Sequence, residues 1–234
     1  MLETVARAPY FSYVSVIHLF ESFGWWRASE LRKVHFAEEW NELHHLLIME
    51  SLGGNAEWKD RFFAYHAVLA YYWALVVLYI FRPQLSYNFS HLVEVHAHVT
   101  YEEFIEENAE LLKSLPPPPI AVNYYKTGDL YLFDTFQTSK ESKENLRRPP
   151  CDNLYDVFRN ISDDEFEHIK TMKAMENWCK GGESPIETMD EFYMNQGGLS
   201  MTGPEDAEKR AAWLKFSEET NAKPEDKKEE VKTE

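Results

Sequence analysis

Apolar residues recur every three or four positions along five stretches of the chain, a spacing that is typical of amphipathic α-helices. Few stretches alternate between apolar and polar residues, as a half-buried strand would. A Phe-Gly-Trp-Trp turn, a Gly-Gly-Asn turn, Pro83 and a run of four prolines separate the stretches. The pattern therefore predicts an all-α helical bundle, with helices over approximately residues 2–22, 29–51, 60–82, 86–114 and 152–180.

A long connection, residues 116–150, separates the last two predicted helices. It is too aromatic for a disordered linker, so we expect it to pack on the bundle. After Gly181 the chain becomes polar and ends in a charged run that cannot bury enough apolar area to become ordered. We therefore expect one domain over residues 1–180 and a largely disordered tail over 181–234, to which we assign no chemistry.

The segment Phe62–Phe81 is apolar over about the length that crosses a bilayer. Several tyrosines and a tryptophan interrupt it, and these residues favour the boundary between water and lipid. The composition favours an interfacial helix that lies in one leaflet of a membrane. A membrane-spanning helix and a buried bundle helix remain alternatives.

The composition of the chain limits the function classes and the types of metal ligand that are possible. The chain has 234 residues, 44% of them hydrophobic, which is enough for a single domain with a sizeable core. A net charge of -16 argues against binding to nucleic acid. Its two cysteines, Cys151 and Cys179, can form neither a disulfide framework nor a tetrahedral thiolate site. Any metal must therefore be held by oxygen and nitrogen, and the compartment is expected to be reducing.

Two Glu-x-x-His pairs lie within the predicted helices, Glu42 with His45 and Glu165 with His168. Residues three apart share one face of a helix, so each pair can hold one ion. Among nine histidines about one such pair is expected by chance, so the count alone is weak evidence. Each pair nevertheless lies in a long helix that should be partly buried, where a carboxylate is costly unless a metal ion compensates its charge.

In helix bundles, two such pairs and one glutamate from each of two further helices form a carboxylate-bridged di-iron or di-manganese site. Glu94 is a candidate because its neighbours in the sequence are apolar, and Glu3 is the remaining one. Four carboxylates and two imidazoles suit iron or manganese and leave open positions for oxygen. The sequence therefore predicts a ferritin-like four-helix bundle with the metal ligands Glu3, Glu42, His45, Glu94, Glu165 and His168.

Simpler interpretations exist for several of these residues. Glu3, near a terminus, is by itself more often a solvated residue at a helix start. His18 and His66 lie on apolar stripes and are expected to be hydrogen-bonded core residues. His91, His96 and His98 could suggest a separate histidine metal site, but Glu94 and His98, four residues apart, are also a common pair on a helix surface.

The motifs LET, NELHH, VEVHAHVTY and DDEFEH, in this order and spacing, resemble those of the alternative oxidase family of membrane-associated di-iron quinol oxidases. The resemblance covers approximately residues 1–180, nearly all of the catalytic bundle. The segments KVHFAEEWNELHHLLIMESLGGN, AVNYYKTGDLYLFDTFQTS and RRPPCDNLYDVFRNISDDEFEH are more similar to the plastid terminal oxidases than to the mitochondrial branch. The long aromatic insertion before the last helix is part of this likeness.

The resemblance implies that the cofactor is iron, two ions per chain, bound by the six ligands named above. It also implies that Tyr101 is a redox-active tyrosine near the metals, which agrees with its position two helical turns after Glu94. Asp164 is implied as a further residue of the catalytic site, and Asn41, Tyr79 and His18 as supporting polar residues. The residues that would line the quinol pocket are Leu2, Val93, Ala97 and Thr100.

The implied function is that of a membrane-associated quinol:oxygen oxidoreductase, which oxidises plastoquinol or ubiquinol and reduces O2 to water without pumping protons. Its partners would be the quinol, O2, a membrane surface to which it attaches from one side, and a second copy in a homodimer. The expected location is the stromal face of the plastid thylakoid membrane. A di-iron hydroxylase and a ferritin-like iron-binding protein are the alternatives.

The first residues contain no secretory signal and no transit peptide. The apolar run from Val5 to Phe23 already reads as the middle of a packed helix. Members of the resembled family carry a further amphipathic helix before the LET motif. We therefore expect the N-terminus to be missing and Met1 to be a truncation point.

Overall fold

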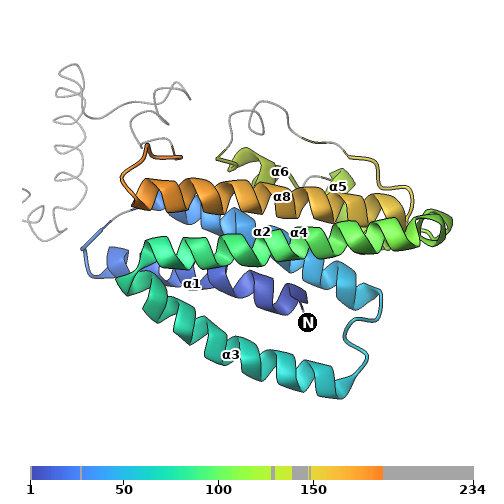
Figure 1. Ribbon diagram of the computed structural model, residues 1–234, viewed down its shortest axis with the longest axis horizontal. Coiled ribbons are helices and arrows are strands. Elements are labelled where there is room, and N and C mark those ends of the chain that lie inside the picture. The colour runs from blue at the N-terminus through green and yellow to red at the C-terminus, as the bar shows by residue number, and fades with distance from the viewer. Residues whose placement is uncertain (1, 27, 128–129, 139–146, 148, 187–234) are drawn as a thin grey trace, which may run out of the picture. The chain divides into compact units, whose positions relative to one another are not determined.

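The computed structural model describes residues 2–26, 28–127, 130–138, 147 and 149–186. Within these residues every regular element is a helix, so the all-α prediction is confirmed. In chain order the helices are α1 (Leu2–Ser22), α2 (Ser29–Ser51), α3 (Trp58–Phe81), α4 (Pro83–Ser114), α5 (Pro119–Thr127), α6 (Leu130–Thr135) and α8 (Leu154–Cys179) (Figure 1).

The helix ends follow local chemistry. Helices α1 and α2 have the predicted bounds. Helix α4 begins at Pro83, three residues before the predicted start, because the fixed φ of proline suits a first helical turn and its missing N–H is not needed there. Helix α8 begins after Asn153, whose side-chain oxygen accepts a hydrogen bond of 2.9 Å from the backbone N–H of Asp156.

Helices α1, α2, α4 and α8 form the bundle that carries the predicted metal ligands. Helix α4 packs along α8 and α1 packs along α2, and contacts of α1 with α4 and of α2 with α8 join the two pairs. Figure 1 shows α4 and α8 running side by side. Two clusters of buried apolar residues fill the bundle, one around Tyr13 and Tyr87 and the other around Tyr124 and Ile161.

Helix α3 packs against α1 and α4 with little of its own surface. Its buried residues are Ala64, Leu75 and Tyr79. Among the described residues it is the one helix long and apolar enough to cross a membrane, judged by length and composition. Only 17% of its most apolar window is buried, which excludes the alternative of a core helix.

The long connection packs on the bundle, as predicted, through α5 and α6, which both contact α2. Its side chains Tyr124, Tyr125 and Phe133 are buried. The sequence pattern predicts no helix here, because each of these helices is too short to establish a helical period. Of the predicted polar tail, residues 187–234 lie outside the described part of the chain.

Candidate metal centre

Three helices of the bundle bring carboxylates and an imidazole to one buried point. Glu3 of α1, Glu42 and His45 of α2, and Glu165 of α8 each offer one ligand atom, and these atoms all lie within 4.8 Å of one another. The Nδ1 atom of His45 is 3.1 Å from Glu165 Oε1, 3.9 Å from Glu3 Oε2 and 4.0 Å from Glu42 Oε2. Four of the six predicted ligands therefore share one site.

Several buried polar atoms in this cluster accept or donate no hydrogen bond within the described residues. A buried polar atom without a partner destabilises a fold unless something else compensates it. An iron ion bound by oxygen and nitrogen would satisfy these atoms, so the donor set fits the predicted cofactor. The unpaired atoms are Glu3 Oε2, both carboxylate oxygens of Glu42, His45 Nδ1, Glu94 Oε2 and Glu165 Oε2.

The other two predicted ligands lie beside the cluster. Glu94 is close enough to Glu165 to raise the pKa of that carboxyl group, and Glu94 accepts a hydrogen bond of 2.7 Å from the phenol of Tyr10. His168 Nε2 lies 3.3 Å from Glu42 Oε1. Glu94 and His168 are thus one contact away from the four-residue cluster, and all six side chains are buried.

Glu38 is a candidate functional residue that sequence reasoning missed. Its carboxylate contacts His168 Nδ1, while His168 Nε2 lies 2.7 Å from the side-chain oxygen of Asn41. Glu38 is fully buried although it follows Ala37 in an acidic run that reads as a solvated surface. The available signal was its position one helical turn before Glu42, on the same face of α2.

Crowded carboxylates shift one another's proton affinities. Burial and the neighbouring Glu165 carboxylate raise the pKa of Glu42, while burial and Glu94 raise the pKa of Glu165. Burial alone lowers the pKa of His45, but a hydrogen bond to Asp164 and the Glu42 carboxylate outweigh it and raise that pKa to about 9. The cluster is therefore a region where positive charge is strongly favoured.

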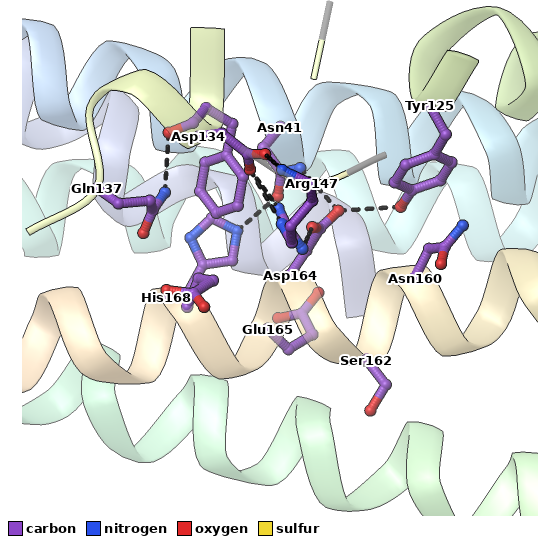
Figure 2. Close-up of polar contacts among 12 residues, drawn as sticks. Asn41, Tyr125, Asp134, Gln137, Arg147, Asn160, Ser162, Asp164, Glu165 and His168 are labelled. Atoms are coloured by element: carbon purple, nitrogen blue, oxygen red, sulfur yellow. Dashed lines mark hydrogen bonds and ion pairs between the residues drawn. The ribbon is translucent and has the colours of Figure 1, made fainter. Parts of the chain in front are cut away.

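Asp164 organises the polar contacts behind the cluster (Figure 2). Its Oδ2 atom accepts hydrogen bonds from His45 Nε2 at 3.0 Å, from the Asn41 amide at 2.9 Å and from the Tyr125 phenol at 2.9 Å. Burial raises the pKa of Asp164, but Arg147 and His45 together hold it well below its usual range. The ionised Asp164 holds the proton of His45 Nε2, so a metal ion in the cluster would bind at Nδ1, in place of the second proton that the raised pKa of His45 otherwise keeps there.

Tyr101 stands beside the cluster on α4. Its phenol donates a hydrogen bond to Glu3 Oε1, and its ring centroid lies 6.2 Å from that of Phe158. Burial and the Glu3 carboxylate raise the pKa of Tyr101 well above its ordinary value. The phenol therefore keeps its proton and directs it at a candidate metal ligand.

The predicted quinol-pocket residues lie on two helices, α1 and α4. On α4, Ala97 is buried, Val93 is half-buried, and Thr100 is exposed with its hydroxyl bonded to the backbone of its own helix. Leu2 lies in α1, and the position of its side chain is outside the described structure.

Two adjoining clefts lie among α1, α2 and α3. The first, of about 330 Å³, reaches Glu3 and Phe158 and is flanked by Arg61. The second, of about 420 Å³, is more apolar and runs past Phe11 on α1. Thr4, Leu46 and Tyr65 line both clefts.

Some predicted supporting residues lie elsewhere. Tyr79 donates or accepts a hydrogen bond of 2.7 Å with Tyr87 in the apolar cluster rather than at the metal centre. The expectation that His18 is a core residue is wrong, because His18 is exposed although it follows the buried Ile17. His66 is also exposed, because α3 buries so few of its residues.

The three histidines of α4 do not form a site of their own among the described residues. His98 Nδ1 contacts Ser162 and His91 Nδ1 contacts the backbone of Ile169, whereas His96 is exposed.

Comparison with known proteins identifies the family. A family model described as alternative oxidase matches residues 1–177. Ubiquinol oxidase 4, chloroplastic/chromoplastic, of Arabidopsis thaliana is 59% identical over 174 residues, which are 74% of this chain and 49% of that protein. A mitochondrial ubiquinol oxidase of Mangifera indica and mitochondrial ubiquinol oxidase 2 of Glycine max are each 27% identical over 132 residues, 54% of this chain and 40% and 38% of theirs.

The chain spans half or less of the length of these relatives. No solved structure is significantly similar to it. The identity of 59% with the plastid protein against 27% with the mitochondrial ones confirms the resemblance to the plastid branch. Since the matched region extends from α1 into the last turn of α8 and includes all six predicted ligands, the chain belongs to the alternative oxidase family.

Proposed function

We propose that this chain is the catalytic part of a di-iron quinol oxidase, which oxidises a quinol and reduces O2 to water without pumping protons. The observation that carries the proposal is the convergence of buried, unpaired ligand atoms from Glu3, Glu42, His45 and Glu165. The names of the relatives, all ubiquinol oxidases, support the quinol as substrate. Residues 1–180 would form the catalytic domain.

The six predicted ligands would hold two iron ions, four of them from the cluster and two, Glu94 and His168, from beside it. Bound iron would supply the one-electron redox chemistry that links quinol oxidation to oxygen reduction. The carboxylates balance the positive charge, and their burial keeps bulk water away. Tyr101 holds a proton on its phenol oxygen, directed at Glu3, where it can move toward the cluster.

The quinol has two candidate routes to this site. The family resemblance favours α4, along Val93, Ala97 and Thr100. The cleft that reaches Glu3 favours the side of α1, α2 and α3, because its apolar extension could hold an isoprenoid tail. The substitution Leu46→Trp fills both clefts, whereas Thr100→Trp adds bulk to α4. The variant that raises the KM for quinol without lowering iron content identifies the route.

The exposed face of α3 supports attachment to a membrane surface. Trp58, Phe63, Leu69 and Trp73 are each at least 60% exposed. Aromatic side chains at this density favour the boundary between lipid headgroups and acyl chains, so we propose that the helix lies in one leaflet. The plastid name of the Arabidopsis relative supports a plastid location, for which we propose the stromal face of the thylakoid membrane. A homodimer remains a further prediction.

The decisive experiment measures oxygen uptake by the iron-loaded protein with plastoquinol and ubiquinol analogues. The expected result is quinol-dependent uptake with water as the product, lost in Glu42→Ala and kept in the surface control Glu107→Ala. A hydroxylated organic product would favour the di-iron hydroxylase instead. Iron uptake without any quinol-dependent oxygen consumption would favour the ferritin-like alternative and overturn the proposal.

A further inference from the structure

The guanidinium of Arg147 bridges two buried carboxylates at the back of the metal centre (Figure 2). Its Nη1 lies 2.6 Å from Asp164 Oδ1. Its Nη2 and Nε donate to Asp134 Oδ1 at 2.7 and 3.0 Å, and its backbone N–H donates to Asp134 Oδ2 at 2.8 Å. Asp134 lies in α6 and Asp164 in α8, so one side chain of the long connection joins both helices.

This arrangement depends on the shape of arginine. The planar guanidinium presents several N–H donors in fixed directions, so it can bind two carboxylates at once, whereas a lysine ammonium is a single point of charge. Asp134 and Asp164 are 1% and 0% exposed. Without the guanidinium both would be buried anions with fewer partners, which is strongly unfavourable.

The two oxygens of Asp164 have different partners. Oδ1 contacts Arg147, and Oδ2 accepts the hydrogen bond from His45 Nε2. The carboxylate is therefore fixed from one side by the long connection and fixes the imidazole on the other. The opposite ring atom, His45 Nδ1, is the one that faces Glu165 in the cluster.

We propose that Arg147 is a positioning residue for the metal centre. By holding Asp164 in place, it sets the orientation of the His45 ring and directs Nδ1 at the metal. The inference rests on the proposed function in that His45 binds a metal ion. It adds a role for the long connection, which carries part of the likeness to the plastid branch: the connection supports the metal centre through Arg147 as well as covering the bundle.

The test uses Co²⁺ as the probe, because its visible absorption reports the ligands and their geometry. The variant Arg147→Met removes the guanidinium and keeps an unbranched side chain. The matched control is Arg159→Met on α8. It breaks a salt bridge of 2.5 Å between Arg159 and Glu102, whose side chains are each 37% exposed. Metal-free unfolding temperature, Co²⁺ affinity and the Co²⁺ spectrum are measured for each protein.

Loss of such an outer partner typically weakens metal binding by about 10- to 100-fold. We expect Arg147→Met to weaken Co²⁺ binding by this factor and to alter the spectrum, and Arg159→Met to change neither. We further expect His45→Ala in the Arg147→Met background to weaken binding less than it does in the wild type, because both substitutions act on the same ligand.

Wild-type Co²⁺ affinity and an unchanged spectrum in Arg147→Met would overturn the inference, whatever its unfolding temperature. If that variant does not fold, Arg147→Lys decides the matter: it keeps the charge but loses the double contact, so an altered spectrum supports the inference and an unchanged one overturns it. Failure of the wild-type protein to bind Co²⁺ or iron at all would instead overturn the proposed function.

Discussion

The hydroxyl group of Tyr101, rather than its ring, determines what this residue can do at the metal centre. The ring packs near Phe158, and only its hydroxyl reaches Glu3. A phenylalanine at this position would keep the packing and lose the proton-bearing oxygen. The contribution of the hydroxyl to catalysis can therefore be separated from the contribution of the ring to stability.

We expect Tyr101→Phe to keep the fold and near-normal iron content while lowering quinol oxidase turnover by orders of magnitude, a loss of about 3 kcal/mol or more in transition-state stabilisation. Turnover and bound iron are measured on the same sample. Tyr155→Phe, on α8 and half-buried, is the matched control. Retained turnover in Tyr101→Phe refutes a redox role, and loss of iron along with turnover shows damage to the site.

His35 gives a pH dependence that is independent of the metal ligands. It is buried beside Tyr87, whose hydroxyl lies 2.8 Å from its Nε2, and burial lowers its pKa from 6.5 to about 3. Unfolding exposes the ring, so the unfolded chain binds a proton below pH 6.5 that the folded chain refuses. The stability that His35 contributes is therefore complete above pH 6.5 and is lost as the pH falls from 6.5 toward 3.

Between pH 7 and pH 5 this loss amounts to about 2 kcal/mol. We expect the drop in the free energy of unfolding over this interval to be smaller by that amount in His35→Gln than in the wild type. Urea denaturation of the metal-free proteins at both pH values measures it. An equal drop in the two proteins would mean that His35 is already charged in the fold.

At the scale of helices, periodicity and turn signals were sufficient to predict the bundle. Local sequence determines where α1 and α2 begin and end, and the i, i+3 spacing of Glu42 and His45 is a property of one helix. Contacts between distant segments were not predictable in this way. Glu38 approaches His168, and Arg147 joins Asp134 to α8, only once the chain has folded. The spacing of Glu38 from Glu42 indicates its face of α2 but not its partner, and no spacing marks Arg147.

The cap of α8 tests how much of this helix depends on its first turn. Asn153 accepts a hydrogen bond from the backbone N–H of Asp156, and Asp156 in turn accepts one from the backbone N–H of Asp152. We expect Asn153→Ala to lower the free energy of unfolding by about 1 kcal/mol and Asn153→Ser to lower it by less. Urea denaturation measures both, and equal losses in the two variants would argue against a capping role.

Helix α3 provides the test of membrane attachment. We expect the double substitution of Leu69 and Trp73 by glutamate to reduce binding to lipid vesicles strongly, because it puts two charges into the exposed apolar face. Leu111→Glu, at a 59% exposed site on α4, is the control. Cosedimentation with vesicles gives the bound fraction, and an equal effect of both changes would show that α3 has no special part in binding.

The predicted ligands come from four helices, so a bound ion would link these helices and stabilise the whole bundle. We expect about two irons per chain, fewer in Glu94→Ala or His168→Ala, and an unchanged number in Glu107→Ala. An ion present at a hundredfold excess over its Kd stabilises the folded state by about 2.7 kcal/mol. Chelation should therefore lower the unfolding temperature by about 5–10 °C. An unfolding temperature that does not respond to chelation would show that no ion is bound in the cluster.

The spread of the ligands along the sequence sets the order of events during synthesis. Glu3 lies in the first turn of α1, but its neighbour Glu165 and the further predicted ligand His168 lie in the last helix of the bundle. No partial chain that ends before α8 can assemble the site, because the second Glu-x-x-His pair, Glu165 with His168, would be missing. If the site binds iron as proposed, the ion would therefore enter after the last helix has been made, and its delivery would be a maturation step that follows translation.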